Sequence, residues 1–252
     1  MTALTAVLPE RAQYISETAC SIQRAKTVVQ QAGWTLNWIV VIDGPGEVAS
    51  QYLTDQVVRL PARQGISAAR NVGLSKAESH WVFPLDSDDL LDADGLLKLL
   101  KTSSNEQNLV WLGANRLLLD GHRTAHWNRD PQRWTPGELA TQWSAPFAFH
   151  PNSVIVNRNA ALSVGGWPAV GVNEDLALVL LLSEIGDGGF DPAVLTHYRV
   201  WEKQEISASD YEEKKKIAFC VIQALVNARR ALLHRGGIIA PCPGAAHGKH
   251  PA

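Results

Sequence analysis

Short apolar runs alternate with longer segments of helical periodicity through the first ninety residues. The apolar runs predict four strands, at 3–8, 36–42, 57–60 and 81–85. Two segments between them predict helices, at 14–32 and 65–76. The first has apolar residues on one face at helical spacing, namely Ile15, Ala19, Ile22, Ala25 and Val29. This alternation predicts right-handed βαβ units and therefore a parallel sheet.

The pattern is less regular after residue 90. It predicts helices at 95–101, 158–164, 176–185 and 211–233, and strands at 108–114, 116–119, 152–156 and 191–200. Asp120-Gly121 indicates a hairpin turn after the second of these strands. Residues 127–149 are rich in Trp, Pro and Gln, and they predict a loop with a short helix near 136–142. Because long loops in compact domains are commonly functional, we interpret this one as part of an acceptor pocket.

Composition and charge narrow the class of protein. The chain has 252 residues and a net charge of -2, without a stripe of Lys and Arg, so a nucleic-acid partner is not expected. Its three cysteines form neither a disulfide framework nor a zinc pattern, which suits a reducing cytosol. No signal peptide is visible, and no apolar run reaches the ~20 residues of a spanning helix. We therefore expect a cytoplasmic protein with no transmembrane segment.

Acidic residues follow the fourth predicted strand directly. Residues 81–85 lead into Asp86-Ser87-Asp88-Asp89. Open α/β sheets bind ligands at the carboxyl ends of their strands, and Mg²⁺ or Mn²⁺ is held by one or two carboxylates together with phosphate oxygens. The alternative is that these residues cap a helix beginning near Leu90. Their position at a strand end favours a metal that carries a phosphorylated ligand.

Other polar residues have weaker signals. Asp43 ends the second predicted strand before Gly44-Pro45-Gly46, and an ordinary turn explains it equally well. Arg70 belongs to a short helix that precedes the acidic strand end, where a guanidinium can meet a phosphate or a base. Glu174-Asp175 stands at a helix start, where acids are favoured by the helix dipole. Together with the acidic strand end, Asp175 becomes a candidate general base.

Four of these segments, in this order, resemble the family-2 glycosyltransferases of the GT-A fold across most of residues 3–207. They are Asp43, the Gly65 to Gly73 segment with its Ala-Arg-Asn, the Asp86-Ser87-Asp88-Asp89 motif, and Gly165-Gly166-Trp167 followed by Glu174-Asp175-Leu176. The resemblance implies a single α/β domain of GT-A type, with a Rossmann-like, mostly parallel central sheet flanked by helices. We assign 1–208 to this domain, with a nucleotide-binding half at 1–92 and an acceptor-binding half at 93–208. A C-terminal helix at 209–235 and a disordered tail at 236–252 follow.

The resemblance also implies roles for individual residues. The residues expected to contact the nucleotide or the donor are Pro9, Asp43, Arg70, Asp86, Ser87, Asp88 and Arg199. Asp88 would be the principal ligand of Mn²⁺ or Mg²⁺, with Asp86 beside it. Asp175 would be the catalytic base, with Glu174 contacting a sugar. Gly166, Trp167 and Trp201 are assigned to the acceptor side.

The chain departs from the family pattern at three places. Asp43 is followed by Gly44-Pro45-Gly46 rather than by a second acid and Gly-Ser. Pro9-Glu10-Arg11-Ala12 replaces the usual Pro-x-Tyr-Asn, and Trp201 stands where the family often has a histidine that reaches the metal. Trp201 cannot ligate a metal. His197 is either a substitute ligand or a packed histidine at a strand end, and both interpretations stay open.

The function implied is an inverting transfer of a sugar from a nucleotide-diphosphate donor, such as a UDP-sugar. The acceptor would be a hydroxyl group of a small molecule or glycan, such as a soluble natural product. Three alternatives remain: a nucleotidyltransferase, a hydrolase with two carboxylates, and a non-catalytic sugar- or nucleotide-binding module. The first would need a Gly-rich phosphate loop after the first strand, and residues 9–13 contain no glycine.

Overall fold

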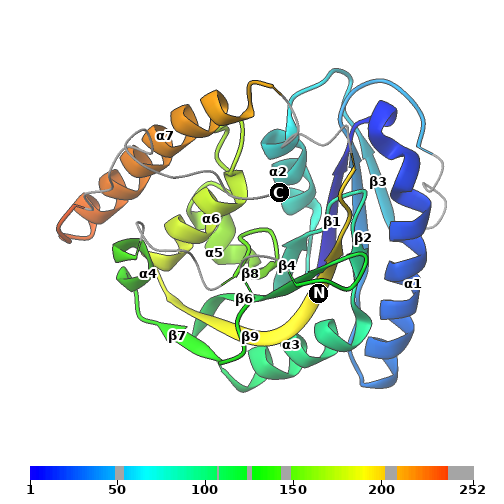
Figure 1. The fold of residues 1–252 in the computed structure, drawn as a ribbon, viewed down its shortest axis with the longest axis horizontal. Helices are drawn as coiled ribbons and strands as arrows, with labels where there is room; N and C mark the ends of the chain where they lie inside the picture. Colours follow the sequence, from blue (N-terminus) through cyan, green and yellow to red (C-terminus); the bar gives the residue numbers. More distant parts are fainter. Residues whose placement is uncertain (49–53, 107, 124–126, 143–148, 202–208, 238–252) are drawn as a thin grey trace.

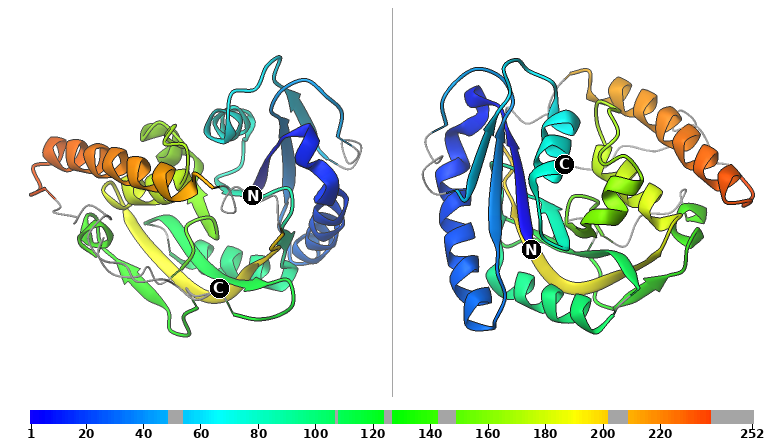
Figure 2. Two further views of the ribbon diagram at one scale, coloured as in Figure 1. Left: turned by 45° about the horizontal axis from the view of Figure 1, so that its top comes forward. Right: turned by 180° about the vertical axis from the view of Figure 1, so that it is seen from behind.

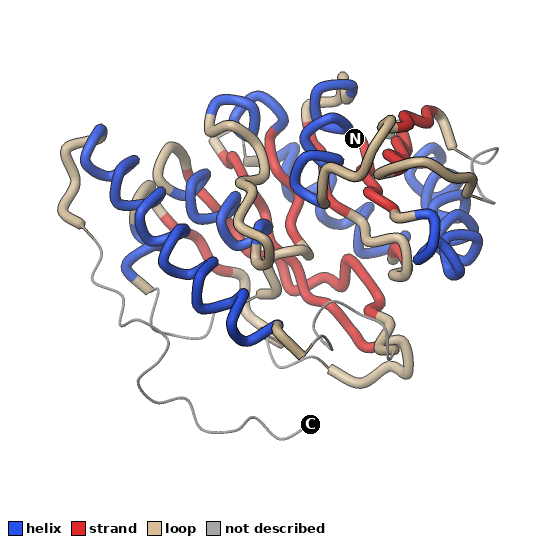
Figure 3. Tube along the Cα trace, turned by 90° about the horizontal axis from the view of Figure 1, so that it is seen from above, coloured by secondary structure: helices blue, strands red, loops and turns tan. Residues whose placement is uncertain are grey.

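The computed structural model describes residues 1–48, 54–106, 108–123, 127–142, 149–201 and 209–237. Within these residues the chain forms one α/β domain, in which helices cover both faces of a nine-stranded sheet (Figures 1, 2 and 3). The sheet has the strand order β3-β2-β1-β4-β8-β6-β9-β5, and β7 pairs with β9. The predicted fold class is therefore confirmed.

Most elements fall where the sequence predicts them. The strands are β1 (Thr2–Val7), β2 (Asn37–Ile42), β3 (Gln56–Arg59), β4 (Trp81–Pro84), β5 (Leu90–Leu91), β6 (Leu109–Leu118), β7 (Gln132–Trp134), β8 (Val154–Asn157) and β9 (Asp187–Tyr198). The helices are the 3-10 helix η1 (Pro9–Tyr14) and the α-helices α1 (Ile15–Gln31), α2 (Ile66–Lys76), α3 (Ala93–Asn105), α4 (Glu138–Thr141), α5 (Arg158–Ser163), α6 (Glu174–Ser183) and α7 (Tyr211–Leu232).

The first half of the chain forms a parallel sheet with one shared edge. β1 pairs in parallel with β2 and with β4, and β2 pairs in parallel with β3. Val7 lies opposite Ile42, and Leu4 lies opposite Pro84. The residues that follow these strands therefore meet at the carboxyl edge of the sheet, where α/β folds bind ligands.

The second half continues the same sheet with mixed directions. β8 inserts between β4 and β6 and is antiparallel to both, whereas β6 and β9 are parallel along most of their length. The predicted strands at 108–114 and 116–119 join into the single strand β6. The curved ribbon of β9 extends beneath α6 and ends beside the N-terminal half of the sheet (Figures 1 and 2).

Each face of the sheet has its own hydrophobic core. α1 and α3 cover one face, and the five α1 residues predicted to share a side are all fully buried there. α2, α5, α6 and α7 cover the other face. Burying each large aliphatic side chain contributes about 1.5–3 kcal/mol to folding, so the cores on both faces stabilise the sheet.

Three short elements were not predicted: η1, β5 and β7. The start of α3 also excludes the capping interpretation of residues 86–89. Its N-cap is Asp92, whose Oδ1 accepts a hydrogen bond from the N–H of Gly95 at 2.8 Å. Residue 95 must be glycine, because a side chain there would overlap the backbone of Val194. Asp86, Asp88 and Asp89 therefore do not cap this helix.

The predicted C-terminal helix is present as α7. Its three consecutive lysines pair with the N-cap residue Asp210 and with Glu212 and Glu213 of the first turn, which fits the predicted solvated face. The predicted tail lies almost wholly outside the described residues. Among the residues that the structure describes, no helix is both long and apolar enough to cross a bilayer.

Candidate active site

The motifs from both halves of the chain meet around one buried guanidinium, that of Arg70 on α2. Its Nη1 donates to Oε1 of Glu174 at 2.6 Å and to both carboxylate oxygens of Asp175 at 3.1 Å. Its Nη2 donates to Oδ1 of Asp86 at 2.8 Å. The side chain of Arg70 is only 2% exposed. One cation thus joins the acidic strand end to the acidic start of α6.

One positive charge cannot neutralise three carboxylates, and the pKa values reflect this imbalance. Burial alone would lower the pKa of Arg70, but Asp175, Asp86 and Glu174 raise it above its ordinary value, so Arg70 stays charged. Burial raises the pKa of Asp175 to about 7, although Arg70 opposes the shift. Asp175 can therefore exchange a proton near neutral pH, which a general base requires.

The backbone at the start of α6 presents both acids to Arg70. Asn173 precedes the helix with a φ of 60°, in the left-handed region that asparagine tolerates better than most residues. Such backbone strain is often found at functional sites. The acids also stand in the first turn, where the helix dipole favours negative charge.

Hydrogen bonds between Asn71 and Trp167 fix the position of the indole that contacts Asp175. The side-chain amide of Asn71 donates to the backbone C=O of Trp167 at 2.9 Å and accepts from its N–H at 2.8 Å. Gly166 has a φ of +72°, and a side chain there would overlap Asn71. The indole Nε1 of Trp167 then donates to Oδ1 of Asp175 at 2.7 Å.

The structure gives Gly166 and Trp167 a supporting contact that the sequence did not indicate. Trp167 is only 1% exposed, and its indole N–H holds the carboxylate of Asp175. Gly166 allows the close approach of Asn71. Both residues therefore help to position Asp175, and their assignment to the acceptor side stays a prediction.

The acids after β4 point in different directions. Asp86 bonds Arg70 and also accepts from Nδ2 of Asn152 at 3.1 Å. Asp89 turns inward to Nη2 of Arg116 at 3.1 Å, and both side chains are 2% exposed. Burial raises the pKa of Asp89 well above its usual range, although Arg116 opposes this. The backbone C=O of Ser87 accepts from Thr18 of α1 at 3.0 Å, which anchors the loop.

The chain after β9 crosses over the acidic loop that follows β4, residues 86–89, at Asp88. Nε of Arg199 donates to the backbone C=O of Asp88 at 3.0 Å, and its guanidinium lies 4.0 Å from the ring centre of Tyr14. The indole Nε1 of Trp201 donates to Oδ2 of Asp88 at 2.6 Å. Trp201, expected on the acceptor side, therefore contacts the predicted principal metal ligand in this structure.

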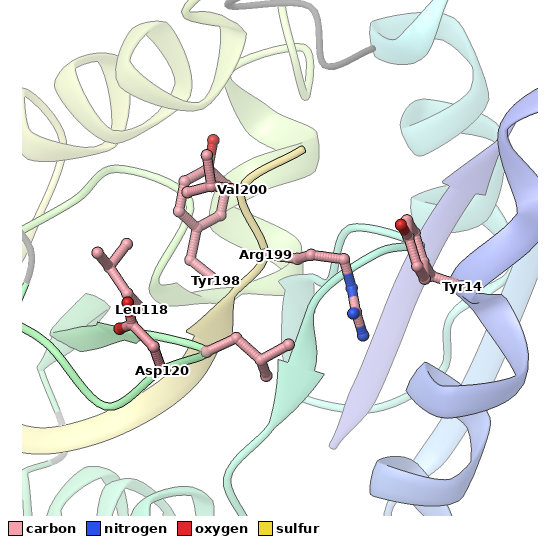
Figure 4. A pocket seen from close by; sticks show the side chains of 7 residues that line it. Tyr14, Leu118, Asp120, Tyr198, Arg199 and Val200 are labelled. Carbon is pink, nitrogen blue, oxygen red and sulfur yellow. The ribbon is translucent and has the colours of Figure 1, made fainter. Parts of the chain in front are cut away.

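A pocket opens beside this crossing. Its volume is about 380 Å³, within the range of small-ligand sites. Figure 4 shows Arg199 extending from the end of β9 towards Tyr14, with Tyr198 and Val200 from the same strand end and with Leu118 and Asp120 from the end of β6. The pocket thus combines aromatic and apolar walls with one cation and one carboxylate.

Asp43 and Pro9, two predicted nucleotide contacts, lie at the same carboxyl edge of the sheet. The carboxylate of Asp43 is buried and accepts from the backbone N–H groups of Gln64 and Gly65 at 2.6 and 2.9 Å. It thereby fixes the loop that leads into α2. Pro9 lies against Gly46 of the next loop. A contact of Asp43 with a base stays a prediction.

His197 lies against a different acid. Its Nε2 is 3.0 Å from Oδ2 of Asp92, and this hydrogen bond is the main reason why the pKa of Asp92 lies below its usual range. The geometry therefore favours the packed strand-end histidine over the substitute metal ligand.

Two polar residues of the site, Arg116 and Asn152, were not identified from the sequence. Arg116 contacts Asn152 at 2.7 Å and Asp89, and its guanidinium lies 3.7 Å from the ring centre of Tyr198. An arginine inside the mostly apolar strand β6 was the available signal. Asn152 precedes β8 in a turn and had no comparable signal. Together these residues connect Asp86 to Asp89.

The oxygen ligands at this edge suit a hard divalent cation of the kind that the resemblance implies. Asp86 and Asp88 offer carboxylate oxygens, which Mg²⁺ and Mn²⁺ prefer. Among the described residues, no group of three or more His, Cys, Asp or Glu is arranged to hold a metal. A cation bound at Asp86 and Asp88 would therefore take its other ligands from phosphate and water.

Comparison with known families decides the class of protein. A model described as Glycosyl transferase family 2 matches residues 11–160, which is more than half of the chain. The chain belongs to this family. It is thus a glycosyltransferase, and the nucleotidyltransferase, hydrolase and non-catalytic alternatives give way. The match includes Asp43, Arg70 and the acidic loop, whereas Glu174 and Asp175 lie beyond it.

Solved structures of the same fold agree with this membership. S. aureus TarS 1-349 in complex with UDP-GlcNAc is 14% identical, with a TM-score of 0.64 over 91% of this chain and 72% of that chain. S. aureus TarS itself has a TM-score of 0.61 at 14% identity, covering 91% of this chain and 43% of that chain. At these identities the likeness shows the GT-A fold alone. No curated protein matches the chain significantly.

Proposed function

We propose that this glycosyltransferase moves a sugar from a UDP-sugar to a hydroxyl group of a small-molecule or glycan acceptor, with inversion. The observation that carries the proposal is the shared contact of Arg70 with Asp86 on the donor side and Asp175 on the acceptor side. This juxtaposition supports a proton acceptor that works beside the edge of the sheet where we propose that the diphosphate binds. The complex of TarS with UDP-GlcNAc, on the same fold, supports the choice of donor.

Asp175 is the proposed general base. The acceptor hydroxyl loses its proton as its oxygen attacks the anomeric carbon, and the bond to the diphosphate breaks. A carboxylate on the face opposite the leaving group receives this proton in a single displacement, so no covalent nucleophile is needed. Arg70 and Trp167 hold the carboxylate in place, and Glu174 shares Arg70 with it.

Asp88 and Asp86 would hold Mn²⁺ or Mg²⁺, which when bound neutralises negative charge on the diphosphate. Trp201 donates to the same carboxylate of Asp88, so its indole must share or leave that oxygen when the donor side is filled. Arg199, which lies over the backbone of the acidic loop, is a second positive group for the diphosphate.

Calorimetric titration with nucleoside diphosphates tests the donor assignment. UDP is titrated first, with Mn²⁺ and again with EDTA, followed by the other nucleoside diphosphates. We expect metal-dependent binding that is selective for UDP, because the carboxylates alone repel the diphosphate. Binding of no nucleotide under either condition would contradict the proposal.

The metal assignment predicts the behaviour of Asp88→Ala. The variant should lose at least about tenfold in UDP affinity in the presence of Mn²⁺ and should no longer respond to EDTA. Asp94→Ala, an acid in the first turn of α3, is the matched control and should bind as the wild type does. Unchanged metal-dependent binding in Asp88→Ala would remove Asp88 from the metal site.

The pKa of Asp175 predicts the pH dependence of turnover. A base acts only when ionised, so kcat/KM, which reports the free enzyme, should rise about tenfold per pH unit below a pKa of about 7 and level off above it. Steady-state rates between about pH 5 and pH 9 check this, with UDP binding measured at both ends. A kcat/KM that stays constant down to about pH 5 would contradict the assignment, because the base would then titrate near the ordinary value for Asp.

A further inference from the structure

From Ile217 onward, the outward side of α7 consists almost entirely of apolar side chains. The helix packs on α6 through Ala218, Ile222 and Val226, which are fully buried. Its other side exposes a row of apolar residues with alternating spacings of four and three, which we call the outer stripe: Ile217, Val221, Ala224, Ala228 and Ala231, flanked by Cys220, Leu225 and Leu232. No charged residue interrupts this row.

The outer stripe is unusual for a helix face in contact with water. Ile217 is 59% exposed and Leu232 75% exposed. Figure 1 shows α7 along the outer edge of the molecule next to α6, and Figure 3 shows it on the outside of the helical layer. Surface helices normally present charged and polar residues on this side. A contiguous apolar row of about 22 Å, from the helical rise of 1.5 Å per residue, therefore indicates a partner.

The spacing and the side-chain sizes point to a second copy of the same helix. A repeat of four and three is the spacing of the seam between two packed helices. Large residues stand at the start of the stripe, Ile217 and Val221, and alanines follow at 224, 228 and 231. Antiparallel packing puts the large end of one stripe against the small end of the other. We infer that the protein forms a two-fold symmetric dimer through antiparallel packing of the outer stripes of two α7 helices.

Charge contributes little to the choice of orientation. The first turn of α7 contains Glu212 and Glu213, and the last turn contains Arg229 and Arg230. In an antiparallel pair centred on Ala224, Glu213 of one copy faces position 235 of the other, and both Arg230 and Arg235 are already bound to Glu184. Because Lys215 and Lys216 pair with the two glutamates on the surface, shape decides more than charge.

The stripe fits a membrane surface less well. Helices that lie in a bilayer interface combine Trp, Phe and Leu on one face with a Lys- and Arg-rich polar face. The outer stripe consists of alanines from its middle to its C-terminal end, and no aromatic residue belongs to it. The flanks of α7 contain both signs of charge. The inference rests on α7 alone and is independent of the proposed function.

The mass of the full chain in solution tests the dimer. Light scattering after size exclusion should show the wild type moving from one chain towards two between about 1 and 100 µM, the range suited to so small an interface. Ala224→Glu should stay monomeric throughout, because two carboxylates would meet at the centre of the seam. Gln30→Glu adds the same charge to the exposed side of α1 and should dimerise as the wild type does. Circular dichroism checks that both variants are folded.

Several outcomes would overturn the inference. A dimeric Ala224→Glu would place the interface elsewhere. A wild type that is monomeric at all these concentrations would exclude the dimer. If that monomer sediments with phosphatidylserine vesicles, the stripe is a membrane surface. If it dimerises only after removal of residues 238–252, that segment covers the stripe instead.

Disulfide formation tests the orientation. In a chain with Cys20, Cys220 and Cys242 changed to Ser, Ala224→Cys lies next to its own symmetry mate in an antiparallel pair. Under mild oxidation it should give a covalent dimer. Ile217→Cys lies far from its mate in the same pair and should stay monomeric on a non-reducing gel. Efficient crosslinking of Ile217→Cys would indicate parallel packing and contradict the proposed geometry.

Discussion

Asp175→Asn is expected to lower kcat by about 10²–10⁴-fold, while the affinity for UDP stays within about twofold of the wild type. Asparagine keeps the size of the side chain, and its amide oxygen can still accept from the indole N–H of Trp167. It cannot take a proton from the acceptor hydroxyl. Arg70 keeps two carboxylate partners, so the fold should survive. Steady-state kinetics and calorimetry on the same preparation separate the two effects.

Glu174→Gln provides the comparison for this variant, because Glu174 shares the same guanidinium. We expect it to change the affinity for a sugar substrate more than the proton transfer, and hence to leave more of kcat intact. Near-normal turnover in Asp175→Asn together with a large loss in Glu174→Gln would move the base to Glu174. Equal turnover in all three proteins would place the base outside α6.

Arg70→Met is expected to lower the free energy of unfolding by about 3–5 kcal/mol, the usual cost of leaving buried charges uncompensated. The side chains of Glu174 and Asp175 are only 10% and 13% exposed, so water cannot replace the lost cation. Methionine fills much of the same volume, which keeps the effect electrostatic. Urea denaturation with linear extrapolation measures the difference.

A surface pair supplies the control for Arg70. Lys26 and Asp55 lie 2.6 Å apart, and their side chains are 21% and 42% exposed. Lys26→Met should cost at most about 1 kcal/mol, because solvent screens both charges. Similar losses in the two variants would mean that the carboxylates around Arg70 hold protons at neutral pH. A stable Arg70→Met would then require a different account of the cluster.

Sequence patterns predicted the fold well because its signals are local. Buried parallel strands read as apolar runs, and α1 shows its inner face through helical spacing. The same local signals predicted that Asp86 and Glu174 would stand at element ends. They also led to the right family, since four weak segments in order restrict the choice far more than any one of them.

The pairing of side chains was not predictable in the same way. Trp167 and Trp201 both have an aromatic face and an indole N–H, and the sequence does not say which will be used. In the structure each N–H holds a different acid, Asp175 or Asp88. Arg70 meets partners more than a hundred positions away, at 174 and 175. Such contacts depend on how β8 and α6 pack against the first half, and no local pattern contains that information.

The strand order has a consequence for how the protein is made. β4 pairs with β1 on one side and with β8 on the other, and β8 follows it in the chain by some seventy residues. When only the first half of the chain has left the ribosome, β4 is therefore an edge strand without its second partner. Open edges with apolar strands invite pairing between chains. We expect residues 1–92, expressed alone, to aggregate rather than to bind nucleotide, because this fragment lacks β8 and leaves one side of β4 unpaired.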